Sequence, residues 1–402
     1  MSSRLLLVAA GLVALAGCDG PQALDAWPAR LEIVEGNFQT GLTGYPVNLP
    51  PAVRLLDSDG DPIAGARITF SAAGGGVAGT DAVTGGDGIA AVGGWTVAAG
   101  QNRLTASIPA PFRVDPVVFS ATGATAAYQI DLAYLTAVPA ARRATFDSAA
   151  ARWQRLVFGD LQDITVELPI PPGACLGNEP AISGTIDDLL IFVTLDSIDG
   201  PGAILGAAGP CFIRTRDTLP VIGVMLFDTA DVASLEGVGL FDEVILHEMG
   251  HVLGFGSLWA LRRLLSDGGG SDPHFVGPQG RRAFDRVGGA GYTGGQKVPV
   301  ENSGGPGTRD VHWRESVFGH ELMTGFLDGG VLNPLSLVSV AAMGDQRYLV
   351  NYAAADGFTL ALAPPAGAPP VGGVRLALGD DVLRLPVYTV DGTGRVTGVY
   401  RR

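Results

Sequence analysis

Two histidines and a glutamate in one short apolar segment constrain the fold more than any other feature of this sequence. His247, Glu248 and His251 stand within residues 240–253, a stretch otherwise rich in Leu, Ile, Val and Met. Residues four apart lie on one face of an α-helix, and the residue after the first is rotated by about 100°. Burying such polar groups in an apolar helix costs free energy unless they are paired. The segment therefore predicts a buried helix whose two histidines share a ligand.

The spacing of these side chains fits a catalytic zinc ion. Two imidazoles one helical turn apart can converge on one Zn²⁺ at about 2.0–2.1 Å. Glu248 then lies beside the metal, where a general base can take a proton from the water that the metal holds. We predict one catalytic zinc ion, with His247 and His251 as ligands and Glu248 as the catalytic base. The bare pattern also occurs by chance, and a catalytic site needs a third protein ligand.

The position of the third ligand is open at this point. In zinc sites of the metzincin type the chain turns at a glycine and returns a third histidine, whereas in the gluzincin type a glutamate from a second helix completes the site. Gly254 fits the turn after the active helix, but Ser257 stands where the third histidine is expected. All five histidines of the protein lie between 247 and 320. The candidates are His274, His312 and His320, with Glu315 and Glu321 as the carboxylate alternatives.

A longer match narrows this choice. The run HEMGHVLGFGSLW, then a long Gly-rich insertion, then VHWRESVFGHELMTGFLDGG resembles the leishmanolysin family of metzincin peptidases. The resemblance covers 128–352 and implies an α+β catalytic domain with a mixed sheet, acting as an endopeptidase on proteins and peptides. It implies that His312 is the third zinc ligand and that Met323 is the Met-turn residue beneath the metal. It also implies that the strand 221–227 lines the cleft and pairs with an extended substrate. The alternatives are that His312 is a surface histidine and that Met323 is an ordinary core methionine.

Residues 29–124 have the pattern of an all-β domain, with short alternating runs separated by turn clusters. The runs LLDSDGDPIAGARITFSAAGGG and VVFSATG resemble the bacterial Ig-like domains of the invasin and intimin type, so we expect an Ig-like β-sandwich. Asp57, Asp59 and Asp61 look like the start of a calcium loop. An EF-hand needs a carboxylate at its twelfth position, where Ile68 stands, so we interpret the segment as a β-turn with calcium as the alternative.

The N-terminus predicts export from the cytoplasm. Residues 1–18 combine a positive start at Arg4, an apolar run too short to span a bilayer, and the ending Leu-Ala-Gly-Cys18. This resembles a bacterial lipoprotein signal, which implies that Cys18 is lipidated and that 19–28 is a tether. The alternative is an ordinary cleaved signal. We predict a lipoprotein of the bacterial cell envelope, periplasmic or surface-facing, that meets the membrane only through its lipid anchor.

The other two cysteines, Cys175 and Cys211, are expected to form a disulfide, because an exported protein meets an oxidising compartment. Two free buried thiols are the alternative. With the pair formed, no thiol is left to hold the zinc ion in a latent form.

The charge of the chain excludes one class of partner. The formal net charge is −14, and no dense cluster of Lys and Arg is present. Such a chain is repelled by nucleic acid and by anionic membrane surfaces. We therefore expect no nucleic-acid partner.

The residue pattern predicts further elements in the catalytic region and in the C-terminal region 353–402. The expected helices are 140–158, 240–253 and 333–343, the last capped by Asn333. The expected strands are 164–168, 189–195 and 221–227, separated by loops that carry Cys175 and Cys211. The expected irregular parts are a loop-rich stretch at 256–310, a linker at 363–370 and a β-hairpin at 385–400.

A surface adhesin is the rival hypothesis, in which the Ig-like domain acts and the metzincin fold is a scaffold. The sequence favours the enzyme, because the three histidines, Glu248 and Met323 are all present together.

Overall fold

The computed structural model describes residue 24, residues 26–360 and residues 374–401. The predicted signal 1–18 with Cys18, most of the tether 19–28 and the expected linker 363–370 lie outside the described residues. By its internal contacts the chain divides into two compact units. The first contains the described residues up to Phe38, with Leu49–Thr96 and Asn102–Ala121, and the second contains Gln39–Asn48, Val97–Gln101 and Thr122–Arg402.

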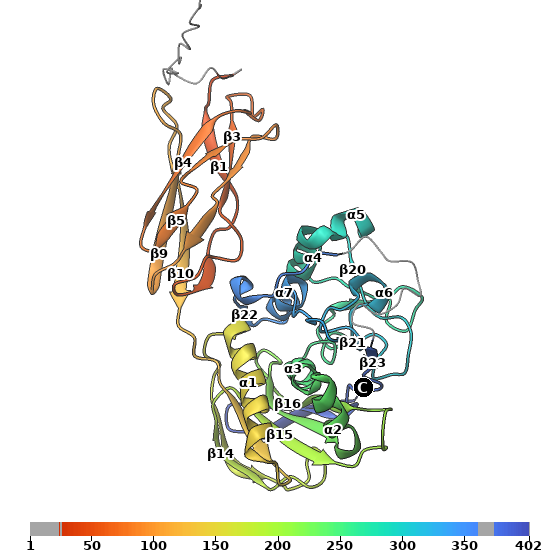
Figure 1. Ribbon diagram of the computed structural model, residues 1–402. Helices are drawn as coiled ribbons and strands as arrows, with labels where there is room; N and C mark the ends of the chain where they lie inside the picture. Colours follow the sequence, from red (N-terminus) through yellow and green to blue (C-terminus); the bar gives the residue numbers. More distant parts are fainter. Residues whose placement is uncertain (1–23, 25, 361–373, 402) are drawn as a thin grey trace, which may run out of the picture. The chain divides into compact units, whose positions relative to one another are not determined.

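Residues 30–124, all of which the structure describes, form ten short strands of a β-sandwich (Figure 1). A three-stranded sheet has the order β1-β3-β7, a five-stranded sheet has the order β2-β10-β9-β4-β6, and β5 pairs with β8. The strands are β1 Arg30–Glu35, β2 Gln39–Leu42, β3 Ala52–Leu56, β4 Arg67–Ala73, β5 Gly76–Ala78, β6 Asp81–Val83, β7 Ile89–Ala91, β8 Gly94–Thr96, β9 Gly100–Ser107 and β10 Val117–Ala124.

Alternation explains these strands. Ile68 and Phe70 of β4 are buried, as are Phe119 and Ala121 of β10, so every second side chain enters the core. The predicted turn is confirmed, because one carboxylate oxygen of Asp57 accepts the backbone N–H groups two and four residues later, each at 2.9 Å. Among the described residues, the acidic side chains of this turn form no cluster that could hold a metal ion.

A six-stranded mixed sheet is the frame of the second unit (Figure 1). Its order is β11-β15-β17-β16-β24-β25. The first three strands are parallel, β16 runs antiparallel to β17, β24 is parallel to β16, and β25 is antiparallel to β24. The strands are β11 Ile130–Tyr134, β15 Leu189–Asp196, β17 Pro220–Asp228, β16 Gly206–Arg214, β24 Val387–Val390 and β25 Val396–Tyr400.

The sheet order corrects two expectations. β17 has a hydrogen-bonded neighbour on each side, so it has no free edge, and the prediction that 221–227 pairs with substrate is wrong. Cys211 lies in β16 and not in a loop. The glycines and alanines of 206–209 suggested a loop, but all nine residues of this strand are buried, and small side chains suit a strand covered on both faces.

Three helices pack beside this sheet: α1 Ala140–Leu156, α2 Thr229–Val238 and α3 Phe241–Val252. The rings of Phe146 in α1, Phe227 in β17 and Phe241 in α3 meet edge to face, with centroids 5.2 to 6.1 Å apart. The indole N–H of Trp153 donates to the backbone oxygen of Leu246 at 2.9 Å, which joins α1 to α3. The predicted helices 140–158 and 240–253 are present, except that the first ends at Leu156 and Val157–Phe158 forms the strand β12. The helix α3 is held against both the sheet and α1.

The rest of the second unit consists of short elements. They are β12 Val157–Phe158, β13 Ile164–Ile170, β14 Ile182–Ile186, β18 Leu265–Ser266, β19 His274–Phe275, α4 Pro278–Phe284, the π-helix η1 Asp285–Gly289, α5 Ala290–Thr293, β20 Val298–Pro299, α6 Glu315–Phe318, β21 Phe326–Gly329, α7 Leu337–Asp345, β22 Leu349–Val350, the 3₁₀-helix η2 Tyr352–Ala354 and β23 Val374–Ala377. The stretch 256–310, expected as loop, thus holds helices and paired strands. The many glycines of this stretch led to the prediction of a loop. The signals for α4 were the Pro at its start and the apolar Ala283 and Phe284, which are buried.

The predicted helix at 333–343 begins later than expected. Its cap is Ser336, whose side chain accepts from the backbone N–H of Ser339. Asn333 instead accepts the N–H of Asp328 at 2.9 Å and donates to the oxygen of the same residue at 3.0 Å. Its side chain is thus used by the preceding turn, and the next polar residue caps the helix.

The C-terminal hairpin at 385–400 forms, and it is part of the central sheet. β24 pairs with β16 from Phe212 to Arg214. The disulfide between Cys175 and Cys211 is also present, with Cα atoms 5.7 Å apart, and it ties β16 to the loop after β13.

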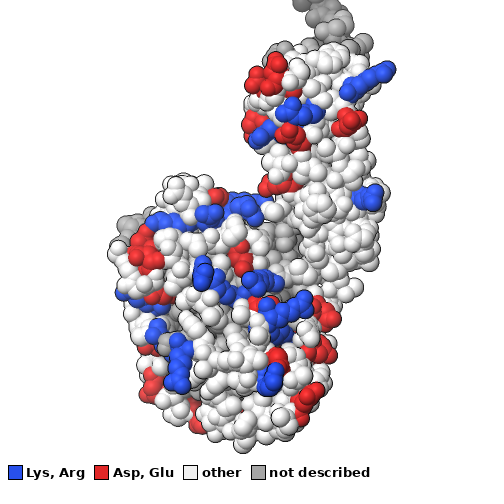
Figure 2. Space-filling view, turned by 180° about the vertical axis from the view of Figure 1, so that it is seen from behind, with Lys and Arg blue, Asp and Glu red and all other residues white. Residues whose placement is uncertain are grey.

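The charged side chains are of both signs on the face that Figure 2 shows, where Lys and Arg alternate with Asp and Glu among uncharged areas. Within the described ranges, none of the helices combines the length and the apolarity needed to cross a bilayer.

Candidate metal centre

The helix α3 presents His247, Glu248 and His251 to one buried place. All three side chains are fully buried. Between them Gly250 leaves room for a neighbour, because a Cβ atom there would lie 2.8 Å from the methyl carbon of Met323 and 3.0 Å from the ring of Trp153. The apolar residues of α3 pack into the core, and His247, Glu248 and His251 lie on the side of the helix that faces the candidate site.

The chain after α3 turns through two glycines with positive φ, Gly254 at +105° and Gly256 at +65°. A Cβ atom on Gly256 would lie only 1.9 Å from the backbone oxygen of Val311. This close approach brings the segment that carries His312 against the turn. Ser257, which stands where a third histidine was expected, donates its hydroxyl to the backbone oxygen of His251 at 2.7 Å and closes the helix end.

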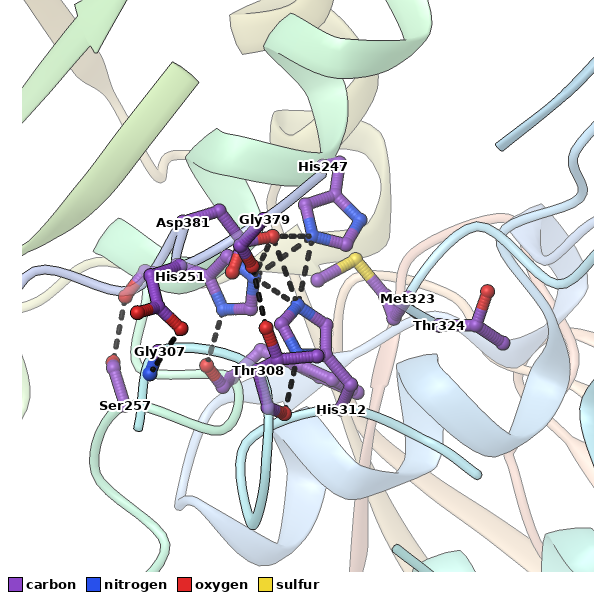
Figure 3. A network of polar contacts seen from close by, with 12 residues as sticks. His247, His251, Ser257, Gly307, Thr308, His312, Met323, Thr324, Gly379 and Asp381 are labelled. Carbon is purple, nitrogen blue, oxygen red and sulfur yellow. Dashed lines mark hydrogen bonds and ion pairs between the residues drawn. The ribbon is translucent and has the colours of Figure 1, made fainter. Parts of the chain in front are cut away.

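Three imidazoles meet at this place (Figure 3). The Nε2 atoms of His247, His251 and His312 are 2.8 to 3.1 Å apart. Each Nδ1 donates to a backbone oxygen, of Leu322 at 2.6 Å, of Phe255 at 2.9 Å and of Thr308 at 2.9 Å respectively. A carbonyl oxygen can only accept, so the proton is on Nδ1 and the Nε2 lone pairs point at one another. This is the tautomer that a metal site requires.

A fourth side chain, which the sequence did not indicate, completes the group. Oδ2 of Asp381 lies 3.2 Å from Nε2 of His247, 3.1 Å from that of His312 and 3.9 Å from that of His251 (Figure 3). The side chain is fully buried, and its Oδ1 atom has no hydrogen-bond partner. Asp381 follows His247 by 134 residues and belongs to no motif.

The four atoms fit a divalent metal ion of zinc's size. A regular tetrahedron with ligands at about 2.05 Å has edges of about 3.3 Å. The six separations among the three Nε2 atoms and Oδ2 of Asp381 run from 2.8 to 3.9 Å, around that value. Three neutral imidazoles and one carboxylate are also ligands that zinc accepts.

Burial and mutual charge set the protonation of the site. Burial lowers the pKa of His247 and His251, which keeps both imidazoles neutral. Burial would also lower the pKa of His312, but the Asp381 carboxylate raises it overall. Burial, and then the charge of Asp381, raise the pKa of Glu248 well above its ordinary value. Glu248 has no hydrogen-bond partner on either carboxylate oxygen, so it is a buried group that takes a proton readily.

Met323 and Glu321 form the floor next to the triad. The methyl group of Met323 reaches the space left by Gly250, and its backbone N–H donates to Glu321 at 2.6 Å. The other oxygen of Glu321 accepts from the backbone and hydroxyl of Ser336 at 3.0 and 2.7 Å. Both oxygens of Glu321 are thus occupied by hydrogen bonds that support the Met323 turn. Glu321 is not part of the histidine cluster, so the alternative that it is the third metal ligand is wrong.

The remaining candidates lie outside the cluster. Among the described residues, the group at this place that could hold a metal ion contains His247, His251, His312 and Asp381 alone. His274 lies in β19 with its Nδ1 on the backbone oxygen of Asp272, His320 packs near Phe358, and Glu315 pairs with Arg375 at 2.9 Å.

Comparison with known proteins gives one family for this region. Residues 161–266 match the model of the leishmanolysin family, peptidase M8. The match includes His247, Glu248 and His251 and ends before His312, so this part of the chain is similar to the leishmanolysin metallopeptidases. Among curated proteins, none matches the chain.

Several solved structures are similar to parts of the chain. The D0-D1 domain of intimin is 17% identical over 24% of this chain and 48% of that one, with a TM-score of 0.19. A β-glucuronidase of Parabacteroides merdae is 13% identical over 26% of this chain and 13% of that one, with a TM-score of 0.18. Domains 4–9 of the surface layer protein SbsC are 14% identical over 30% of this chain and 19% of that one, with a TM-score of 0.17. The chain spans about half the length of the intimin fragment.

Proposed function

We propose that the leishmanolysin-type domain of this chain is a zinc-dependent endopeptidase that hydrolyses proteins and peptides outside the cytoplasm. The observation that carries the proposal is the meeting of three Nε2 lone pairs beside a buried glutamate without a partner. A structural zinc site has no need of that glutamate, whereas a hydrolytic site does.

The residues of the chain take distinct roles in this proposal. His247, His251 and His312 hold the zinc ion, which when bound lowers the pKa of water and polarises the scissile carbonyl group. Glu248 accepts the proton of the attacking water and passes it to the leaving amine. Neither carboxylate oxygen of Glu248 has a hydrogen-bond partner, so the group is available for both transfers.

Three backbone oxygens orient the zinc ligands, and the side chain of Met323 packs beneath them. The Nδ1 donors fix the rotation of each imidazole, as described above. Met323 fills the space beneath Gly250, so we assign it the Met-turn position. The packing of its thioether there limits the movement of α3 toward the floor of the site.

Action outside the cytoplasm rests on two features of the chain. The N-terminal segment resembles a lipoprotein signal, and Cys175 and Cys211 form a disulfide. Structural disulfides persist in oxidising compartments and are rare in the cytosol. Protein substrates follow from the family of the domain.

The test is the variant Glu248→Gln in the full chain, saturated with zinc and assayed on an unfolded protein such as labelled casein. Because Asp381 lies at the cluster, the assay is run in the wild-type background and in the Asp381→Asn background. We expect unchanged zinc content and a loss of cleavage of about 10²- to 10⁴-fold in the background that is active.

The matched control is Asp242→Asn, an exposed acidic residue in the first turn of the same helix, which leaves cleavage unchanged. Zinc-loaded protein that cleaves in neither background would overturn the proposal and favour the adhesin, with the domain as a scaffold. Cleavage that survives Glu248→Gln and stops with a chelator would overturn the role of Glu248.

A further inference from the structure

Asp381 reaches the cluster on a segment whose two ends are fixed. We name residues 374–384 the C-terminal strap. Its first part, β23, pairs antiparallel with β21, which follows the Met323 turn. The backbone N–H of Leu378 continues this pairing by donating to Gly325 at 3.1 Å. On the other side, the N–H of Gly307 donates to the side chain of Asp380 at 3.2 Å. The strap therefore crosses the site between the Met323 turn and the segment that carries His312.

The second part of the strap lies along β16. The backbone N–H of Ala208 donates to the oxygen of Asp381 at 2.8 Å, and the N–H of Leu383 donates to the oxygen of Ala208 at 2.9 Å. These bonds make a parallel bridge between Ala208 and Val382. The other part of β16, from Phe212 to Arg214, is already paired with β24. The strap thus covers the remaining edge of β16.

That edge adjoins the proposed catalytic base. A Cβ atom on Gly206, the first residue of β16, would lie 3.3 Å from the Cγ atom of Glu248. An extended peptide bound to this edge would run past Glu248 and the three imidazoles. Adding a strand to a free sheet edge is a general way to bind an extended peptide, because the backbone groups of both chains are paired.

The surroundings of Asp381 point to a cation. Among the described residues, its ion-pairing partners are the three imidazoles alone, and no Lys or Arg pairs with it. Burying a carboxylate costs several kcal/mol unless a positive group compensates it. Oδ1 has no partner, which is a further sign that the carboxylate faces a group that supplies positive charge.

We propose that Asp381 is a fourth protein ligand of the zinc ion and that the C-terminal strap is an inhibitor built into the chain. This inference rests on the proposed function. A catalytic zinc ion has three protein ligands and one open position, and four protein ligands close it. The strap fills the open position with Asp381 and covers the edge of β16 with its backbone. Substrate enters only when the strap leaves both places.

The test uses the full chain with cobalt in place of zinc, because cobalt absorbs visible light in a way that reports its ligands. The probe is acetohydroxamate, a small molecule that binds an open metal position through two oxygens. The variants are Asp381→Asn and Asp381→Ala. The matched control is Asp380→Asn, the adjacent and exposed carboxylate on the same strap, because the amide oxygen of Asn can still accept the N–H of Gly307.

We expect the cobalt spectra of the wild type and of Asp380→Asn to be unchanged by acetohydroxamate, and those of both Asp381 variants to change. We also expect the Asp381→Ala variant to bind zinc at least tenfold more weakly in competition with a chelator. Cleavage of casein per bound zinc ion should rise at least tenfold in Asp381→Asn. Circular dichroism and denaturant midpoints identify any variant that has not folded, and the wild-type spectrum alone still shows whether the site is closed.

The outcomes separate this inference from the proposed function. If wild-type cobalt protein takes up acetohydroxamate as readily as the Asp381 variants, and all of these proteins bind zinc equally well and cleave casein at the same measurable rate, the strap is no inhibitor and the peptidase stands. If the spectra and affinities change as expected and no variant cleaves casein, Asp381 is a ligand of a closed site and the peptidase proposal fails. The full inference stands only if access, affinity and cleavage all change at Asp381 and none changes at Asp380.

Discussion

Gly256→Ala is the substitution that most directly tests how the site is assembled. Gly256 has a φ of +65°, and a Cβ atom there would lie 1.9 Å from the backbone oxygen of Val311. A backbone oxygen cannot rotate away as a side chain can, so Val311 must move by about 1.5 Å to reach ordinary contact. His312 is the next residue. The substitution should therefore reach the metal centre through the backbone alone.

The magnitude combines three terms. A left-handed backbone costs alanine about 1–2 kcal/mol, and overpacking of this kind costs about 1–3 kcal/mol. The reduced freedom of the unfolded chain returns about 0.4–1 kcal/mol. We expect the free energy of unfolding to fall by about 1–5 kcal/mol. Metal distances tolerate about 0.2 Å, so a shift of His312 should weaken zinc binding at least tenfold.

The assay is denaturant unfolding, with zinc affinity measured by competition with a chelator. The control is Gly291→Ala in α5, where nothing lies within 4 Å of the added Cβ atom and φ is not positive. This control should raise the free energy of unfolding by about 0.4–1 kcal/mol and leave zinc affinity unchanged. A Gly256→Ala protein with the stability and zinc affinity of the wild type would refute the claim that this contact positions His312.

Three further predictions concern the supports of the site. Replacing Cys175 and Cys211 by Ala should lower the free energy of unfolding by about 4 kcal/mol, since the disulfide spans 36 residues; denaturant midpoints with and without reductant check this, and a loss below about 1 kcal/mol contradicts it. Glu321→Gln places an amide donor against the Met323 N–H in one orientation of the amide and against the Ser336 N–H in the other, and should cost about 2–3 kcal/mol and weaken zinc binding, both measurable on one purified sample. Burial opposes ionisation of Asp228, but four backbone N–H groups lower its pKa from 3.8 to about 2. It should therefore stabilise the fold by about 2 kcal/mol above pH 4 and lose this as the pH falls through 2, while in Asp228→Asn that part of the pH dependence is absent.

The parts of the site that depend on local spacing could be predicted from the sequence. His247 and His251 share a face because of the helical repeat, and the burial of α3 follows from its apolar residues. The pairing of Cys175 with Cys211 was the only pairing that two cysteines allow once Cys18 is set apart. The distant His312 came from a resemblance, since nothing in its own surroundings marks it.

The parts that depend on strand order could not be predicted in this way. The apolar run of β17 predicts a strand but not its neighbours. Only the structure shows that β16 pairs along β17, so that the sheet edge beside the site is formed by β16 and not by β17. Asp381 stands in a stretch of ordinary turn composition, and its role appears only because the strap returns from the far end of the chain. A residue that acts through long-range placement leaves no periodic or spaced signal.

The three acceptors that orient the imidazoles are all main-chain oxygens, of Leu322, Phe255 and Thr308. A main-chain acceptor is retained under any substitution that leaves the path of the backbone unchanged. In a saturation mutagenesis scan, side-chain chemistry at these three positions should therefore be tolerated as far as core packing allows. Intolerance should concentrate instead at glycines such as Gly256, whose missing side chain sets that path. The geometry of the metal centre therefore depends on the path of the backbone, and most side-chain substitutions at these positions should leave it unchanged.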